Sequence, residues 1–247
     1  MNYQVINSTF ETFLLNIQEV FQQEESITLF DKRNIIKVVE HQNEKYVIKS
    51  FKIPHLLNRV IYKFFRASKA QRSYENSMKL LNLNINTPKP IGYIEFDSLL
   101  LFNESYYISH FFDYDFEIRA VFKDKNFTNR NTILKKFVEY TYDLHNKGVY
   151  HIDYSPGNIL IKKVDQEYIF YIIDVNRMKF MEFDINLRMK SMAKLTSSEE
   201  DNSLIVEYYS SISNIDKTTL MQRLNFHLDE QKKYLTNKKR LKKLKKF

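Results

Sequence analysis

The sequence contains no cysteine, only three glycines and no long apolar run. Without cysteine, the chain can form neither a disulfide framework nor a metal site with thiolate ligands. Three glycines provide no glycine-rich loop of the kind that surrounds phosphates with backbone amides. No apolar stretch approaches the ~20 residues that span a bilayer, and the first residues lack the basic start of a signal peptide. We therefore expect the protein to work in the cytoplasm.

The excess positive charge lies at the C-terminal end. Residues 231–247 contain nine of the 38 lysines and arginines and no acidic residue, which leaves 29 basic and 30 acidic residues elsewhere. Leu235, Leu241 and Leu244 would share one face of a helix. A basic amphipathic helix suits an anionic membrane surface or a phosphorylated lipid headgroup. A nucleic-acid patch is a weaker alternative, and a solvated helix or disordered end without a partner stays open.

A short polar segment has the spacing of a phosphoryl-transfer site. Residues 151–160 read HIDYSPGNIL, and Asp174 ends the next apolar strand after a predicted hairpin. The spacing H-x-D-x-x-x-x-N presents Asp153 as a base and Asn158 as a metal ligand from one loop. Asp174 can hold a second position on the metal, so that Mg²⁺ is clamped against the ATP phosphates.

Each of these residues alone has a simpler explanation. His151 alone is typical of a packed, hydrogen-bonded core histidine, and Asp153 or Asn158 alone suits a turn. Asp174 alone could merely end a strand. We favour the catalytic interpretation because loop, hairpin and acidic strand end follow one another in the order that a kinase requires.

The elements around the loop follow from apolar spacing. Apolar residues recur at helical spacing from Arg130 to Lys147, and Gly148 is expected just past the helix end. Residues 159–164 and 168–173 are β-rich runs joined by a turn at 165–167. A buried helix is therefore predicted to lead into the loop.

Upstream, residues 45–51 alternate like a strand, and residues 35–40 are its predicted partner across a turn. Lys49 on this strand suits the lysine that contacts the ATP α- and β-phosphates and pairs with a glutamate. The candidate glutamate is Glu75, on a helix predicted over residues 67–83 with an apolar stripe of Tyr74, Met78 and Leu81, extended by Ala67 and Ala70. The alternatives are an edge-strand lysine that discourages aggregation and a glutamate on a solvated helix face.

Three segments carry a family resemblance: residues 64–70 (FFRASKA), 153–160 (DYSPGNIL) and 174–180 (DVNRMKF). The chain resembles the protein-kinase-like superfamily and, within it, the bacterial lipopolysaccharide kinases that phosphorylate Kdo or heptose sugars of the inner core. The resemblance implies an α+β, bilobal protein-kinase-like fold. Its small β-rich N-lobe holds one main helix, and its C-lobe is mostly helical.

The resemblance also assigns roles. Lys49 and Glu75 would position ATP, Asp153 would act as the base, and Asn158 and Asp174 would bind Mg²⁺. ATP and Mg²⁺ are the implied cofactors, and a lipopolysaccharide core or lipid A–Kdo molecule is the implied acceptor. An enzyme of this kind would work peripherally at the cytoplasmic face of the inner membrane.

The sequence departs from the protein-kinase pattern after the loop. Ser155 replaces the lysine two residues after the catalytic aspartate, and Val175-Asn176 replace the Phe-Gly of the DFG motif. No Ala-Pro-Glu segment follows, and only 73 residues remain after Asp174. The chain therefore has little room for a long peptide-docking segment after Asp174, which favours a small-molecule or glycan acceptor over a protein. Arg177 or Lys179 could supply the missing cationic contact to the γ-phosphate, or form a structural ion pair.

We predict four segments and several further elements. The segments are an ATP-binding lobe at 1–108, a hinge at 109–115, a catalytic lobe at 116–230 and a basic tail at 231–247. The further elements are small-lobe strands at 91–95, 99–102 and 105–108 and a helix of unassigned purpose at 204–212.

Two other functions stay open. A soluble small-molecule phosphotransferase of the aminoglycoside-kinase type would share the loop without needing lipid contact. A membrane-associated pseudokinase scaffold is favoured by the missing glycine-rich loop. The presence of Lys49, Asp153, Asn158 and Asp174 together argues against it.

Overall fold

The structure is a computed structural model that describes residues 1–23, 26–31, 34–53, 55, 59, 61–62, 65–98, 101–196 and 198–244. The chain forms two compact units. Unit 1 comprises Met1–Asp113 and Ile172–Arg177, and unit 2 comprises Tyr114–Tyr171 and Met178–Phe247. Unit 1 therefore includes a short downstream segment, which carries Asp174. The predicted lobe and hinge boundaries stay predictions.

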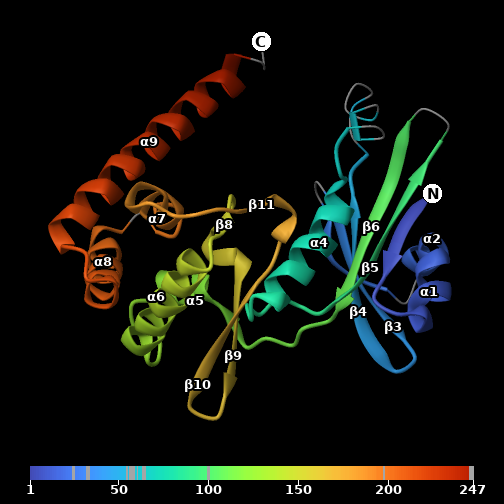
Figure 1. The fold of residues 1–247 in the computed structure, drawn as a ribbon, viewed down its shortest axis with the longest axis horizontal. Helices are drawn as coiled ribbons and strands as arrows, with labels where there is room; N and C mark the ends of the chain where they lie inside the picture. The colour runs from blue at the N-terminus through green and yellow to red at the C-terminus, as the bar shows by residue number, and fades with distance from the viewer. Residues whose placement is uncertain are drawn as a thin grey trace. The chain divides into compact units, whose positions relative to one another are not determined.

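A six-stranded antiparallel sheet forms the centre of unit 1, in the order β1-β5-β6-β4-β3-β2 (Figure 1). Its strands are β1 Asn2–Val5, β2 Ile27–Asp31, β3 Asn34–His41, β4 Glu44–Phe51, β5 Pro90–Asp97 and β6 Phe102–His110. The predicted β3–β4 pair is confirmed. Its turn uses Gln42 and Asn43, both with positive φ, as two-residue hairpin turns require.

Two of the other three strands predicted in unit 1 are confirmed. The predicted strand at 91–95 lies within β5, and the one at 105–108 lies within β6. Of the separate strand predicted at 99–102, Phe102 is instead the first residue of β6, Leu101 is in no strand, and Leu99 and Leu100 lie outside the described residues.

Helices cover both faces of this sheet (Figure 1). The short helices α1 Glu11–Leu15 and α2 Ile17–Gln22, preceded by the 3₁₀ turn η1 Ser8–Phe10, pack on one face, where no element was predicted. Helix α4 Lys69–Asn82 packs on the other face, against Phe51 and Tyr93. Because side chains alternate along a strand, Ile48 points towards α1 and α2, whereas Lys49 shares the α4 face with Phe51. This alternation positions Lys49 for the site.

Helix α4 confirms the helix predicted over 67–83, although with a different buried face. Ser68 is the N-cap, and its side chain accepts a hydrogen bond from the Gln71 amide at 3.1 Å. Its fully buried residues are Ala70, Ser73, Tyr74, Ser77 and Leu80. The expected apolar stripe included Met78 and Leu81, which are only half-buried. The helix can bury serines because the sheet offers partners such as the Tyr107 hydroxyl, 2.9 Å from Ser77 Oγ.

Unit 2 is mostly helical, with a small sheet and a two-stranded ribbon. Its elements are β7 Phe116–Glu117, α5 Ile118–Lys123, α6 Arg130–Asn146, β8 Val149–His151, η2 Pro156–Asn158, β9 Ile159–Val164, β10 Glu167–Ile172, β11 Met178–Phe180, α7 Ile185–Met192, α8 Glu199–Ser213 and α9 Lys217–Leu244. The last residue of β10 belongs to unit 1, as does the 3₁₀ turn η3 Val175–Arg177.

The predicted helix before the loop and the hairpin after it are confirmed. Helix α6 ends at Asn146, and Gly148 follows with φ of 70°, a conformation that favours glycine at a helix end. The turn between β9 and β10 is shorter than predicted, with only Asp165 and Gln166 in it. Helix α8 extends the helix predicted over 204–212 in both directions.

A buried carboxylate connects the helices of unit 2. Asp201, in the first turn of α8, is 1% exposed and accepts hydrogen bonds from Lys125 Nζ at 2.6 Å and from Arg130 Nη2 at the start of α6. Burial alone would raise the pKa of Asp201, but the two cations outweigh it and hold the pKa below its ordinary value. The buried charges of Asp201 and Arg130 therefore lie beside opposite charges.

The basic tail is part of a longer helix and not a separate segment. Helix α9 begins at Lys217, and its first turns bury Leu220, Leu224 and His227. Every described side chain from Lys232 onwards is exposed. Of the two alternatives without a partner, the solvated helix fits the described residues and the disordered end does not, since the chain is helical through Leu244. Leu235 is exposed, but the side chains of Leu241 and Leu244 lie outside the described residues, so the predicted leucine face is described only in part.

No helix in the described part of the chain combines the length and the apolar character needed to cross a membrane.

Buried His145 should make the stability of the fold depend on pH. His145 of α6 lies 2.9 Å from the Tyr209 hydroxyl and 2.7 Å from Ser191 Oγ. Burial, with a smaller effect of Arg188, lowers its pKa to about 3. Below pH ~6.5 the unfolded chain binds a proton that the folded chain does not, so stability falls by about 1.4 kcal/mol per pH unit down to the folded pKa.

We therefore expect His145 alone to remove about 2 kcal/mol of the free energy of unfolding between pH 7.5 and pH 5.0. Urea denaturation at both pH values measures it, with His145→Gln as the reference. The variant should be less stable at both values but lose about 2 kcal/mol less between them. Equal losses for both proteins would contradict the expectation.

Candidate active site

Lys49 and Asp174 form an ion pair within unit 1. Lys49 lies in the middle of β4, which is hydrogen-bonded to β3 on one side and β6 on the other. The edge-strand explanation for Lys49 is therefore wrong. Its side chain is 14% exposed, and its Nζ donates to Asp174 Oδ1 and lies 5.3 Å from the centre of the Phe51 ring. A cation on a rigid inner strand is well placed to contact a phosphate.

Asp174 adopts a backbone conformation that is unusual for a residue with a side chain. Its φ is 58°, in the left-handed region, where aspartate and asparagine are tolerated best. The carboxylate oxygen that contacts Lys49 also accepts a hydrogen bond from Asn176 Nδ2 at 2.7 Å. Two donors thus orient one carboxylate.

The residues on either side of Asp174 are tied to other parts of unit 1. The Ile172 carbonyl accepts a bond from Thr87 Oγ1 at 2.8 Å, and the Ile172 amide donates to the Asn86 carbonyl at 3.0 Å. On the other side, Asn76 Nδ2 of α4 donates to the Val175 carbonyl at 2.7 Å. These bonds fix the chain before and after Asp174 and offset the cost of its conformation.

Glu75 is not brought to Lys49. It is exposed on α4 and accepts a hydrogen bond from Gln71 Nε2, one turn earlier, at 2.8 Å. The phase of the helix is the reason, because Ser73 and Ser77 are turned into the core and Glu75 is turned away. A role for Glu75 in positioning ATP stays a prediction.

The other candidate residues lie on the loop between β8 and β9 in unit 2. His151 is 2% exposed, and its Nδ1 accepts a hydrogen bond from the Asp153 amide at 3.1 Å. The Asp153 carbonyl accepts a bond from Asn158 Nδ2 at 2.9 Å. His151 is therefore a packed histidine that also shapes the loop. The backbone of Asp153 is held from both sides.

The next residue anchors the loop to α6. Tyr154 is 2% exposed and its hydroxyl lies 2.8 Å from Thr141 Oγ1. Burial raises the pKa of the Tyr154 hydroxyl well above its ordinary value, so the group stays neutral. The loop is thus attached to the core of unit 2 directly beside Asp153.

Two cations that the sequence analysis did not single out lie against this loop. Lys194, after α7, donates to the Ile152 carbonyl. Arg119 of α5 covers Gly157, where an added Cβ would lie 1.6 Å from Arg119 Nη2. Gly157 therefore leaves space for a guanidinium. Both cations are far from the loop in sequence, and no local pattern distinguishes them among the 38 basic residues.

Asp174 and Asn158 have the donor atoms that suit Mg²⁺. The described residues contain no group of three or more histidines, aspartates or glutamates able to hold a metal ion. Mg²⁺, however, prefers a few protein oxygens together with substrate phosphates and water. Asp174 offers a carboxylate, and Asn158 uses its amide nitrogen in the loop, so its oxygen is the atom that suits a metal. Each residue by itself offers an oxygen that suits the predicted ion, and the shared metal site stays a prediction.

Comparison with known proteins shows the fold. No protein-family profile and no curated sequence matches the chain. Among solved structures, WaaP in complex with acyl carrier protein matches with a TM-score of 0.64 and 13% identity, over 93% of this chain and 99% of that chain. The chain has the α+β, protein-kinase-like fold that the sequence resemblance predicted.

Two further solved structures match more weakly. A variant of the Mycobacterium tuberculosis PknI kinase domain has a TM-score of 0.48 and 11% identity, over 81% of this chain and 93% of that chain. WbdD with the kinase inhibitor LY294002 has a TM-score of 0.45 and 15% identity, over 81% and 44%.

Removal of the Thr87 hydroxyl should loosen the segment that carries Asp174. Thr87→Val keeps the shape but leaves the buried Ile172 carbonyl without this donor, which costs about 1–3 kcal/mol. The exposed Thr218→Val is the control and should change the free energy of unfolding by less than about 0.5 kcal/mol. Chemical denaturation measures both values. Indistinguishable values would show that this bond does not hold the segment.

Proposed function

We propose that this protein is a kinase that transfers the γ-phosphate of ATP to a hydroxyl of a lipopolysaccharide inner-core sugar, either Kdo or heptose. The observation that carries the proposal is the ion pair between Lys49 on an inner strand and Asp174 in the left-handed conformation. The loop with Asp153 and Asn158, the protein-kinase-like fold shared with WaaP, and the three sequence segments that resemble lipopolysaccharide kinases support the same function.

Lys49 and Asp174 are assigned to the nucleotide. The Lys49 ammonium contacts the α- and β-phosphates of ATP, which places the nucleotide at a fixed point on the sheet. Asp174 and the amide oxygen of Asn158 are the groups that hold Mg²⁺. When bound, the ion neutralises charge on the phosphates and polarises the γ-phosphoryl group. The bonds on both sides of Asp174 keep its carboxylate oriented.

Asp153 is assigned to the acceptor. Its carboxylate orients the sugar hydroxyl for in-line attack and accepts its proton. His151 fixes the Asp153 amide, Asn158 fixes the Asp153 carbonyl, and Lys194 fixes the preceding carbonyl of Ile152. A backbone held at three points needs little rearrangement during reaction.

The exposed end of α9 is assigned to the membrane. Lys232, Lys233, Lys238 and Arg240 are exposed on a helix that also exposes Tyr234 and Leu235. Each cation near an anionic surface contributes about 1 kcal/mol, and the attraction decays within a Debye length of about 8 Å at physiological salt. An enzyme that modifies a lipid-linked sugar would be held near its acceptor by this contact.

The two aspartates should fail in different ways. Asp153→Asn should lower turnover by about 10²–10⁴-fold with ATP binding largely kept, because only the base is lost. Asp174→Asn should weaken Mg²⁺-dependent ATP binding about tenfold or more, because a charged ligand is lost. Labelled ATP with Kdo-lipid or deacylated core acceptors measures turnover, and calorimetry measures ATP binding. Asp165→Asn, in an exposed turn with positive φ, is the matched control and should behave like the wild type.

Wild-type turnover in Asp153→Asn would contradict the mechanism. Phosphorylation of aminoglycosides but not of core sugars would favour a soluble small-molecule kinase. Tight ATP binding without transfer to any acceptor would favour a pseudokinase.

Charge reversal on α9 should weaken membrane binding without harming the catalytic site. The variant carries Lys232→Glu, Lys233→Glu, Lys238→Glu and Arg240→Glu. The control reverses four exposed lysines elsewhere: Lys123, Lys135, Lys163 and Lys190. We expect the α9 variant alone to lose sedimentation with phosphatidylglycerol vesicles at low salt, and to keep wild-type turnover of a soluble, deacylated acceptor. Equal sedimentation of both variants would remove the membrane role, and selective loss of nucleic-acid binding would favour that partner instead.

A further inference from the structure

The loop between β8 and β9 has no cation of its own beside the candidate base. Ser155 occupies the position, two residues after Asp153, at which serine/threonine protein kinases carry a lysine. Negative charge on the γ-phosphoryl oxygens has to be stabilised during transfer, and a positioned cation is the usual means. A cation from another part of the chain would have to take the place of that lysine.

Lys194 of unit 2 contacts this loop next to Asp153. Its Nζ donates to the Ile152 carbonyl. That carbonyl belongs to the same peptide group as the Asp153 amide, which donates to His151 Nδ1 at 3.1 Å. The Lys194 ammonium therefore lies against the peptide group from which Asp153 projects.

The backbone around Lys194 is firmly held. Just after α7, the Ala193 amide donates to the Met189 carbonyl at 3.0 Å, and the Leu195 amide donates to the Met192 carbonyl at 3.0 Å. Met192, Ala193 and Leu195 are buried, whereas Lys194 is half-buried. The lysine thus extends from a packed segment towards the loop. A cation with such support needs little reorganisation when charge develops beside it.

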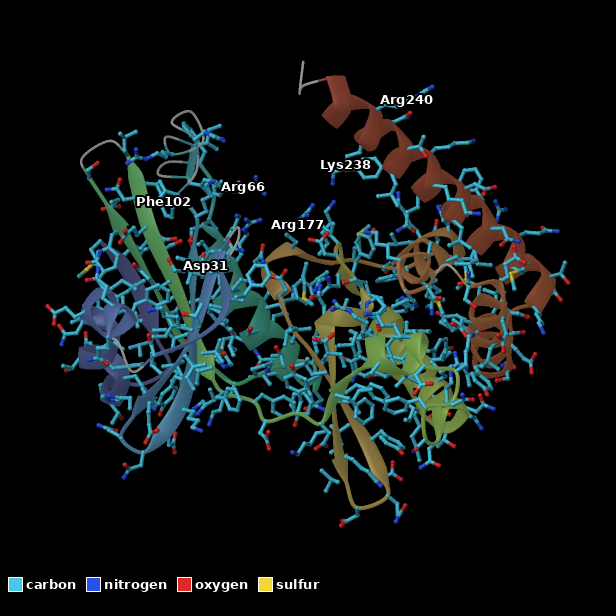
Figure 2. All side chains as sticks on the ribbon, turned by 180° about the vertical axis from the view of Figure 1, so that it is seen from behind. Asp31, Arg66, Phe102, Arg177, Lys238 and Arg240 are labelled. Atoms are coloured by element: carbon cyan, nitrogen blue, oxygen red, sulfur yellow. The ribbon has the colours of Figure 1, made fainter. Side chains whose placement is uncertain are left out.

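The two cations that the sequence suggested for this role are more exposed. Arg177 ends η3 in unit 1 and is exposed (Figure 2). Lys179 lies in β11 opposite Tyr150, and its side chain is also exposed. Water and salt screen an exposed charge more strongly than a half-buried one. The contact of Lys194 with the loop therefore favours Lys194.

We propose that Lys194 contacts the γ-phosphate during transfer and so takes the role of the lysine that Ser155 replaces. This inference rests on the proposed kinase function. Asp153 orients the acceptor hydroxyl, so in-line transfer brings the γ-phosphoryl group to the same residue. An ammonium has three N–H groups, which allows one lysine to contact both the Ile152 carbonyl and a phosphoryl oxygen.

Lys194 keeps all its protons in this step. The hydroxyl oxygen forms a bond to the γ-phosphorus, and the bond from that phosphorus to the β–γ bridging oxygen breaks. The electron pair of the broken bond leaves with ADP, and the hydroxyl proton passes to Asp153. Lys194 only stabilises the negative charge on the transferred group.

The first test measures binding and needs no turnover. Calorimetry with Mg²⁺ compares ADP with a non-hydrolysable ATP analogue that has an imido group between the β- and γ-phosphorus. Lys194→Gln should bind the analogue about tenfold more weakly and ADP like the wild type, because only the analogue has a γ-phosphate. The matched control is Lys190→Gln, at an exposed position of α7, which should bind both nucleotides like the wild type. Equal weakening of both nucleotides, or of neither, would overturn the inference.

The second test measures turnover and rescue. Lys194→Gln should lower kcat about 10²–10³-fold with the KM for the acceptor nearly unchanged. The Ser155→Lys/Lys194→Gln double variant returns a lysine to the position used by protein kinases and should recover at least about tenfold of the lost kcat. A loss of kcat that this variant does not reverse would limit Lys194 to holding the Ile152 carbonyl and overturn the inference.

Two further outcomes separate this inference from the kinase proposal. Wild-type kcat in Lys194→Gln would overturn the role of Lys194 and leave the kinase proposal standing. Lys194-dependent preference for the ATP analogue over ADP, in a wild type that phosphorylates no acceptor, would overturn the kinase proposal and the role of Lys194 in transfer together.

Discussion

The ion pair between Lys49 and Asp174 joins two residues 125 positions apart and belongs entirely to unit 1. A lysine on an inner strand that is largely removed from water needs an opposite charge, and Asp174 provides it. The segment from Ile172 to Arg177 is part of unit 1 because this pair and the bonds from Thr87 and Asn76 hold it there.

The two groups of candidate residues are stabilised by different physical means. In unit 1, the position of Lys49 follows from strand alternation, and a charge holds Asp174. In unit 2, the Asp153 amide donates to His151 Nδ1 and the Asp153 carbonyl accepts from Asn158 Nδ2, so neutral hydrogen bonds hold the backbone of this loop.

Local patterns predicted a large part of this structure. The β3–β4 hairpin, helix α6, Gly148 at its end and the β9–β10 hairpin depend on contacts within short stretches, and periodicity detects such contacts. The buried face of α4 was predicted less well because it buries Ser73 and Ser77, which do not count as apolar. Because the buried face of α4 was predicted incorrectly, Glu75 was also predicted to pair with Lys49. Helices α1 and α2 have five and six residues, too few for periodicity to be informative.

The missed parts of the candidate site depend on contacts between distant residues. Lys194 reaches the Ile152 carbonyl 42 positions away, and no pattern around either residue marks that bond. The sequence analysis separated residues 231–247 from the preceding helix for a different reason. The first turns of α9 bury only a few side chains, Leu220, Leu224 and His227, and one of these is polar. This weak apolar pattern did not indicate a helix before the lysine-rich segment.

The continuity of α9 makes its C-terminal end a rigid arm. Short isolated helices are marginal in water, but this one grows from turns already packed on unit 2, so the costly first turn is formed before the exposed part begins. At 1.5 Å per residue, the stretch from Lys232 to Leu244 extends roughly 20 Å. In a flexible chain, the distance between unit 2 and a surface contacted by the charges would not be fixed. A helix instead fixes that distance, so the number of residues in the arm sets how far unit 2 lies from a surface that the end of the arm contacts.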